Sequence, residues 1–339
     1  MMILHALASL RLTLPGMLLL AAGVLVRYLD AGASVFWIAL PLLLLAINLL
    51  AALLVNPRFR SQPPLLIFHI CLLLLVVLIS ASQLTSLQGQ LEITEGQAFS
   101  ADAVEVVHQG PWHPRQRLQD VAFTQGPVSI DYNPGLKRVR TESRVQAPVA
   151  QAGDPLMVIG DNTPLHAAGY RLYTTPNKGF AAILTRVDGA GNESTGAVHF
   201  PSYPINDWRQ LNGWTSPDGE QLALELVFIE QPDFERSWTL ASGRVATALR
   251  VTARGNTRVL QPGETLQVGD ATLRFQTVRL WMGYEIRYEP LLPWMFATAL
   301  IGVLALAWHF QLRLVARVPG ATDVPRRTGE IQGNAVTRF

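Results

Sequence analysis

The sequence predicts an integral membrane protein with four transmembrane α-helices, three N-terminal and one C-terminal, and a β-rich periplasmic domain between the third and the fourth. Three observations predict it. First, the only charged residues between Arg11 and Ser86 are Arg27, Asp30, Arg58 and Arg60. Second, charges and alternating apolar residues return over residues 92–289. Third, one more long apolar run follows this polar part. A soluble domain could not present the first segment to water, and a signal peptide has a much shorter apolar core.

The predicted spans follow from length, because about 20 apolar residues cross a hydrocarbon core of about 30 Å. Four segments qualify, at residues 12–29, 35–55, 65–84 and 291–312. Pro15-Gly16 loosens the first near its start, and Pro63-Pro64 suit the beginning of the third. We therefore divide the chain into an N-terminal membrane region (1–86), a periplasmic domain (87–290), a fourth helix (291–312) and a cytoplasmic tail (313–339).

The orientation follows from Arg residues in short flanks. With four crossings, three flanks lie on one side of the membrane, and they carry Arg11, Arg58, Arg60, Arg313, Arg317, Arg326 and Arg327. On the opposite side, the short loop of residues 27–34 balances Arg27 against Asp30. Both termini are therefore expected in the cytoplasm.

The polar part of the chain is predicted to be a β-sandwich or a barrel-like domain. Alternating runs recur at residues 170–174, 180–187, 196–200, 221–229, 245–253, 271–280 and 284–288. Turn sequences separate them, among them residues 187–192, 216–219, 261–264 and 268–270. No amphipathic helical pattern longer than two turns is evident.

Composition and motifs exclude several functions. A net charge of +2 gives no indication of nucleic-acid binding, and the single cysteine, Cys71, excludes a disulfide or a CxxC pair. No HExxH, GxSxG or phosphate-binding GxxxxGK motif occurs. Gly189-Ala190-Gly191 resembles a fragment of a nucleotide loop, but its place between strands favours a hairpin turn. The spacing of His108 and His113 could suit a metal, but solvated loop histidines are the favoured interpretation. No complete catalytic site is visible, so an enzyme acting alone is disfavoured.

Two histidines in apolar helices are the candidate site residues. His69 lies five positions past Pro64, about 7 Å into the hydrocarbon region from the cytoplasmic face. An ionisable residue at that depth indicates a functional site. A neutral histidine that donates a hydrogen bond to a neighbouring helix is the alternative, and the residues alone leave both open. His309 ends the fourth helix beside Trp308 and Arg313, which favours an interfacial anchor over a ligand.

Several stretches carry a resemblance to a known family: residues 7–12 (LASLRL), residues 69–96 from His69 to the Glu95-Gly96 pair, residues 162–165 (NTPL), residues 169–173 (GYRLY) and residues 261–264 (QPGE). Together they resemble the ResB-like (CcsB) proteins of System II cytochrome c biogenesis. The order of helices and outer domain matches as well, so the likeness covers the whole chain. Two features depart from the family: the outer domain is short, and Tyr288-Glu289-Pro290-Leu291 replaces its usual acidic Asp-Pro-Gly.

The resemblance implies a subunit in the bacterial inner membrane that handles haem and presents apocytochrome c for covalent haem attachment. It implies a CcsA-type partner, because the tryptophan-rich haem segment of that partner family is missing here; Trp208 and Trp214 are scattered in a predicted loop. It also implies that His69 is an axial ligand of haem b, transient or shared with the partner, with His309 as a weaker alternative within the chain. The chain would then be at most one subunit of a cytochrome c synthase.

Two other classes of function remain open. The chain could be a membrane-anchored module that binds a periplasmic protein, or a structural subunit of a larger membrane complex. Neither of these would bind haem, so co-purification of haem discriminates between them and the haem-handling subunit.

Overall fold

The computed structural model describes residues 2–30, 32–147, 155–160, 162–204, 209–216 and 219–315. The chain forms two compact units. A helical unit comprises Met1–Gly23, Ile38–Ser80 and Pro293–Phe339, and a β unit comprises Val24–Trp37 and Ala81–Leu292. Most of the predicted cytoplasmic tail, including Arg317, Arg326 and Arg327, lies outside the described residues.

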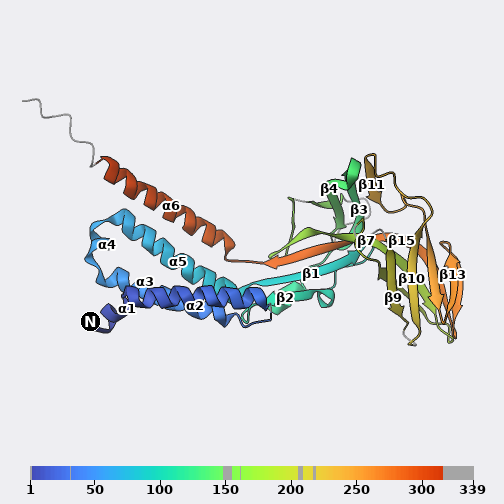
Figure 1. The fold of residues 1–339 in the computed structure, drawn as a ribbon, viewed down its shortest axis with the longest axis horizontal. Helices are drawn as coiled ribbons and strands as arrows, with labels where there is room; N and C mark the ends of the chain where they lie inside the picture. The colour runs from blue at the N-terminus through green and yellow to red at the C-terminus, as the bar shows by residue number, and fades with distance from the viewer. Residues whose placement is uncertain are drawn as a thin grey trace, which may run out of the picture. The chain divides into compact units, whose positions relative to one another are not determined.

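Among the described residues, four helices are long and apolar enough to cross a membrane, three near the N-terminus and one near the C-terminus, which confirms the predicted fold class. The helices in chain order (Figure 1) are α1 (Met2–Leu7), α2 (Leu10–Leu29), α3 (Phe36–Val55), α4 (Pro57–Ser61), α5 (Pro63–Thr85) and α6 (Leu292–Val315). Pro63 and Pro64 open α5, where the missing N–H of proline costs no helical hydrogen bond.

A buried asparagine joins α2 to α3. Asn48 on α3 is 7% exposed, and its Oδ1 accepts a hydrogen bond from Thr13 Oγ1 at 2.8 Å. Its amide nitrogen donates to the carbonyls of Leu7 and Ser9, at the break between α1 and α2. These hydrogen bonds join the start of α2 to α3.

Helices α5 and α6 approach each other at two small side chains. A Cβ added to Gly302 would lie 3.2 Å from Cys71 Cβ. Small residues at such a position let two helix backbones come close in a membrane. Cys71 is buried, in keeping with a contact on this face of α5.

The described part of the β unit contains three antiparallel sheets, which confirms the predicted β-rich domain. The first has the order β2-β1-β15-β7-β6, with β14 also on β15 and β8 also on β7; the second is β13-β12-β10-β9 and the third β11-β3-β4-β5. The strands (Figure 1) are β1 (Leu87–Thr94), β2 (Glu105–Gln109), β3 (Thr124–Asn133), β4 (Lys137–Gln146), β5 (Met157–Gly160), β6 (Leu165–Ala167), β7 (Tyr170–Val187), β8 (Glu193–His199), β9 (Gln210–Thr215), β10 (Gln221–Phe228), β11 (Trp238–Ala241), β12 (Thr247–Ala253), β13 (Asn256–Leu260), β14 (Thr265–Val268) and β15 (Ala271–Tyr288).

Two strands of 18 residues each, β7 and β15, form the centre of the first sheet. Each combines two runs that the sequence predicts as separate strands. Their ladder extends from Thr272↔Val187 to Arg287↔Arg171 and is interrupted by register shifts near residues 276 and 283. The bulges bend the ribbon, so one half pairs with β1 and β6 and the other half with β14 and β8.

The alternation does not predict β1 to β4, the strands of residues 87–146. In β4 the first four residues, KRVR, are exposed, and buried positions begin only at Thr141. This strand is specified by its partners β3 and β5 more than by its own pattern. Buried side chains from all three sheets form one continuous hydrophobic core.

Candidate functional site

The His69 ring on α5 is held by its own helix. Its Nδ1 lies 2.7 Å from the carbonyl oxygen of Leu65, one turn earlier. A carbonyl oxygen only accepts, so Nδ1 is the donor in this contact, and a ring with one proton then presents the lone pair of Nε2. This is the tautomer in which a histidine binds a metal through Nε2.

Aromatic rings surround His69. The ring centroid of Phe59, on α4, lies 4.6 Å from that of His69, and that of Phe68 lies 5.2 Å away in an edge arrangement. The histidine is half-buried within the helical unit.

His309 on α6 is 9% exposed and packs against Phe310, with the ring centroids 5.8 Å apart. Gly302 and Cys71 mark the level at which α6 and α5 meet. His309 lies seven residues after Gly302, and His69 lies two residues before Cys71. Helix α5 leads into β1 and α6 follows β15, its antiparallel neighbour, so the two helices run in opposite directions. The five-residue difference separates the two histidines by about 7 Å along the helix axes.

The interpretation of His108 and His113 as solvated loop histidines is wrong. His113 is 6% exposed; its Nδ1 donates to the Thr85 carbonyl at 3.2 Å, and its Nε2 accepts from Tyr170 Oη at 2.8 Å. The segment after β2 folds back onto the end of α5, where Trp112 N donates to the Leu84 carbonyl at 2.8 Å. Burial lowers the pKa of His113 below its usual value.

His108 lies on strand β2 and contacts a helix residue. Arg27 Nη2 lies 3.1 Å from His108 Nδ1, and Arg27 Nη1 donates to the Ala33 carbonyl at 2.8 Å. Burial and then the positive charge of Arg27 lower the pKa of His108. This arginine, which sequence reasoning used only for charge balance, ties the loop after α2 to β2.

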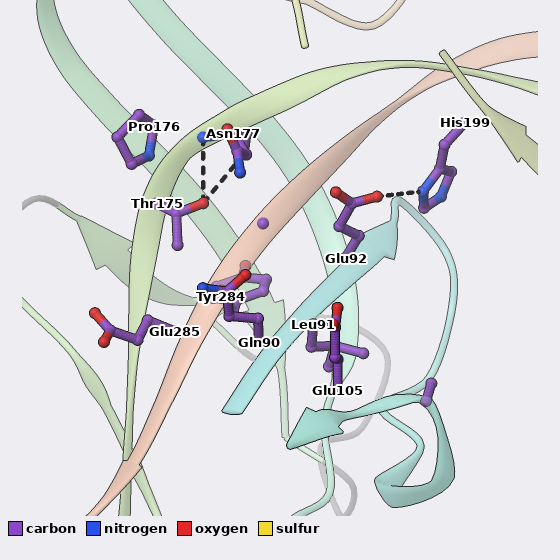
Figure 2. Close-up of a pocket in the computed structure, with 12 residues that line it drawn as sticks. Gln90, Leu91, Glu92, Glu105, Thr175, Pro176, Asn177, His199, Tyr284 and Glu285 are labelled. Atoms are coloured by element: carbon purple, nitrogen blue, oxygen red, sulfur yellow. Dashed lines mark hydrogen bonds and ion pairs between the residues drawn. The ribbon is translucent and has the colours of Figure 1, made fainter. Parts of the chain in front are cut away.

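A cleft of about 570 Å³ lies on the β unit, where β1, β2, β7 and β15 meet (Figure 2). Gln90 and Glu92 on β1 face Glu285 and Gly283 on β15, because these residues are cross-strand pairs. Thr175, Pro176 and Asn177 form one wall, at the bulge of β7. Gly283 is needed there, since a Cβ would lie 2.5 Å from Thr175 Oγ1 and 2.9 Å from the Asn177 carbonyl.

A histidine–carboxylate contact lies at one end of the cleft. His199 Nδ1 is 3.1 Å from Glu92 Oε2 (Figure 2). His199 Nε2 is 2.7 Å from Thr94 Oγ1. The imidazole also stacks on Trp281, with ring centroids 5.3 Å apart and planes inclined by 13°. Both ring nitrogens therefore have partners, so the ring is fixed in place.

Sequence reasoning missed this cleft because its polar residues form no motif. They come from strands that are distant in the chain, and only the β1–β15 pairing brings them together. The prediction that Trp208 and Trp214 lie in a loop is wrong for Trp214, which lies on strand β9. Trp208 lies outside the described residues.

No protein-family model and no curated protein matches this chain. One of the solved structures that it resembles is the cytochrome c haem lyase CcmF, at 15% sequence identity and a TM-score of 0.28. The match covers 89% of this chain and 34% of that protein, so the chain spans about a third of its length. A TM-score of this size carries no inference about fold or function.

Proposed function

We propose that this chain is a subunit for cytochrome c biogenesis that, with a CcsA-type partner, handles haem across the membrane. In this role its β unit presents apocytochrome c for covalent haem attachment. The resemblance of the sequence to ResB-like proteins supports the proposal. The observation that carries it is the hydrogen bond from His69 Nδ1 to Leu65, because it leaves Nε2 free to bind iron.

Haem b is the cargo in this proposal. His69 would hold its iron through Nε2, and apolar residues of α5 would cover part of the porphyrin. The protein would be at most one half of a synthase, so the chemistry of thioether attachment belongs to the complex.

We propose that the partner supplies the second axial ligand. His309 is the alternative within this chain, about 7 Å from His69 along the helix axes. A site shared between two proteins would also make haem binding depend on the complex.

The proposed location is the bacterial inner membrane, with both termini in the cytoplasm and the β unit in the periplasm. The Arg-rich flanks described above support this orientation. His69 would then lie near the cytoplasmic leaflet.

The test is His69→Ala in the full-length protein co-purified with its partner. We expect loss of the low-spin haem absorbance and of cytochrome maturation together. His309→Ala is the matched control and should leave most of both intact. Equal amounts of purified complex and equal thermal stability of the two variants establish that folding is not the cause. A normal haem spectrum with full maturation in His69→Ala would show that this histidine only packs its helix.

A membrane-anchored binding or structural subunit that does not bind haem is the second candidate. The cleft of the β unit favours binding over a purely structural role. Co-purification of one haem per copy of this chain with the wild-type complex would exclude this candidate.

A further inference from the structure

We infer that the cleft and the outer edge of β2 together bind an extended polypeptide segment that carries Lys or Arg side chains. The inference rests on the proposed function in one respect only, that the client is a polypeptide. The test below uses neither haem nor a cytochrome.

The outer edge of β2 is open. This strand pairs with β1 on one side, and within the part of the chain that the structure describes no backbone hydrogen bond joins its other side. Its central residues Val106 and Val107 are 45% and 42% exposed. An exposed, partly apolar strand edge is a template for the addition of another strand.

The edge and the cleft are continuous. The pairing of β2 with β1 ends at Gln90↔Glu105, and both of these residues line the cleft. Beyond that pair, β1 continues from Leu91 to Thr94 with β15 as its strand neighbour. A strand added outside β2 would therefore pass Glu105 and enter the cleft. Each of its residues would extend it by about 3.3 Å.

The charge of the cleft selects a basic segment. Three carboxylates line it, Glu92, Glu105 and Glu285, and none of its 12 lining residues is Lys or Arg. The one residue there that can become cationic, His199, is already paired with Glu92. Arg287, which lies outside the lining, contacts Glu285 through two nitrogens and offsets its charge. Glu105 and the half-exposed Glu92 therefore supply the negative charge of the cleft. Lys or Arg side chains on alternate residues of an added strand would face these carboxylates.

Other ligands fit less well. No group of three or more His, Cys, Asp or Glu residues that could hold a metal ion is found among the described residues, so the carboxylates are too dispersed for a single cation. Anionic phospholipid headgroups and nucleic acid would be repelled by the same charges. An extended polypeptide matches both the dispersed charges and the open backbone edge.

The experiment measures fluorescence anisotropy of a labelled peptide of alternating Lys and Val with the full-length protein in detergent. We expect saturable binding that weakens as salt rises, and at least tenfold weaker binding of the matched peptide of alternating Glu and Val. Glu92→Gln and Glu105→Gln should each weaken binding by about two- to fivefold, the range expected for exposed ion pairs. Glu193→Gln, at an exposed position on β8, is the matched control and should change nothing.

A second arm tests strand addition separately from charge. The Lys-Val peptide with alternate backbone nitrogens methylated keeps its charge but loses donors for a β-ladder, so it should bind at least tenfold more weakly. Val107→Lys on β2 should also weaken binding, whereas Val139→Lys, on the exposed start of β4, should not.

Equal binding of the methylated peptide, or unchanged binding in both Glu variants, would overturn the inference. Equal melting temperatures of all variants ensure that lost binding is not lost folding. If the peptide binds as expected but His69→Ala leaves the haem spectrum unaffected, only the haem proposal is contradicted. The two failures are therefore distinguishable.

Discussion

The side chain of Glu95 accepts a hydrogen bond from the backbone N–H of Val128 at 2.7 Å. Its other carboxylate oxygen accepts from the Ser242 hydroxyl, and Arg279 Nη1 donates to the Glu95 carbonyl at 2.8 Å. Glu95 follows β1 and is 8% exposed. One buried carboxylate thus joins the end of β1 to β3, to the segment after β11 and to β15.

Glu95→Gln should destabilise the protein. The amide has one acceptor oxygen in place of two, and its NH₂ group would face the Ser242 hydroxyl and the Leu280 N–H. An unsatisfied buried group costs about 1–3 kcal/mol, so the melting temperature should fall clearly. Glu193→Gln, on the protein surface, is the control with no expected change. A melting temperature equal to that of the wild type would contradict this account of Glu95.

Stability should fall as the pH is lowered through the range in which free histidine titrates. The pKa values of His113 and His108 are lowered in the folded state, chiefly by burial. Below about pH 6.5 the unfolded chain therefore binds more protons than the folded one, and stability falls until the folded-state pKa is reached. Above that range the effect is absent.

His113→Gln should flatten the fall between pH 7 and pH 5, since one of these two groups no longer titrates. The change in slope is at most about 1.4 kcal/mol per pH unit. Thermal unfolding of the full-length protein at several pH values measures it. His166→Gln, at an exposed position on β6, is the matched control. The same slope in His113→Gln and in the wild type would argue against the burial of His113.

Gly302→Cys should form a disulfide with Cys71 on mild oxidation. The Cβ positions lie 3.2 Å apart, close to the 3.5–4.5 Å of a disulfide. Cys71 is the only native cysteine, so the product is unambiguous. Cleavage of the β unit by protease followed by electrophoresis with and without reductant detects the link between α5 and α6. The controls are Gly302→Cys in a Cys71→Ala background and Val303→Cys, whose position is 64% exposed. Equal cross-linking at residue 303 would contradict the offset inferred for His69 and His309.

Protease added outside spheroplasts should cut within residues 90–285 and leave both termini protected. The Arg-rich flanks motivate this orientation. In a Cys71→Ala background, Arg60→Cys and Thr328→Cys should resist a membrane-impermeant thiol reagent, whereas Asn192→Cys, in the turn between β7 and β8, should react. Labelling of position 60 or 328 from outside would reverse the predicted topology.

The sequence by itself determined the features that depend on short stretches of chain. The four spanning helices follow from the length of uninterrupted apolar runs, because a bilayer requires a fixed length. Turns follow in the same way from local backbone preferences. Gly263 adopts a φ of 91° in the predicted Pro262-Gly263 turn between β13 and β14. Residues 189–191 form the predicted hairpin, capped by the Asp188 carboxylate, which accepts from the N–H groups of Ala190 and Asn192.

Only the tertiary structure decided which distant residues meet. Glu92 and Glu285 share a cleft because β1 and β15 pair in one register, and a slip of β1 by one residue would turn Glu92 to the opposite face from Glu285. His113 is buried because its loop folds back onto the end of α5, a contact that its own Pro-rich surroundings do not encode. Strand register and long-range packing are set by the free energy of the whole core, so no local pattern in this chain specifies them.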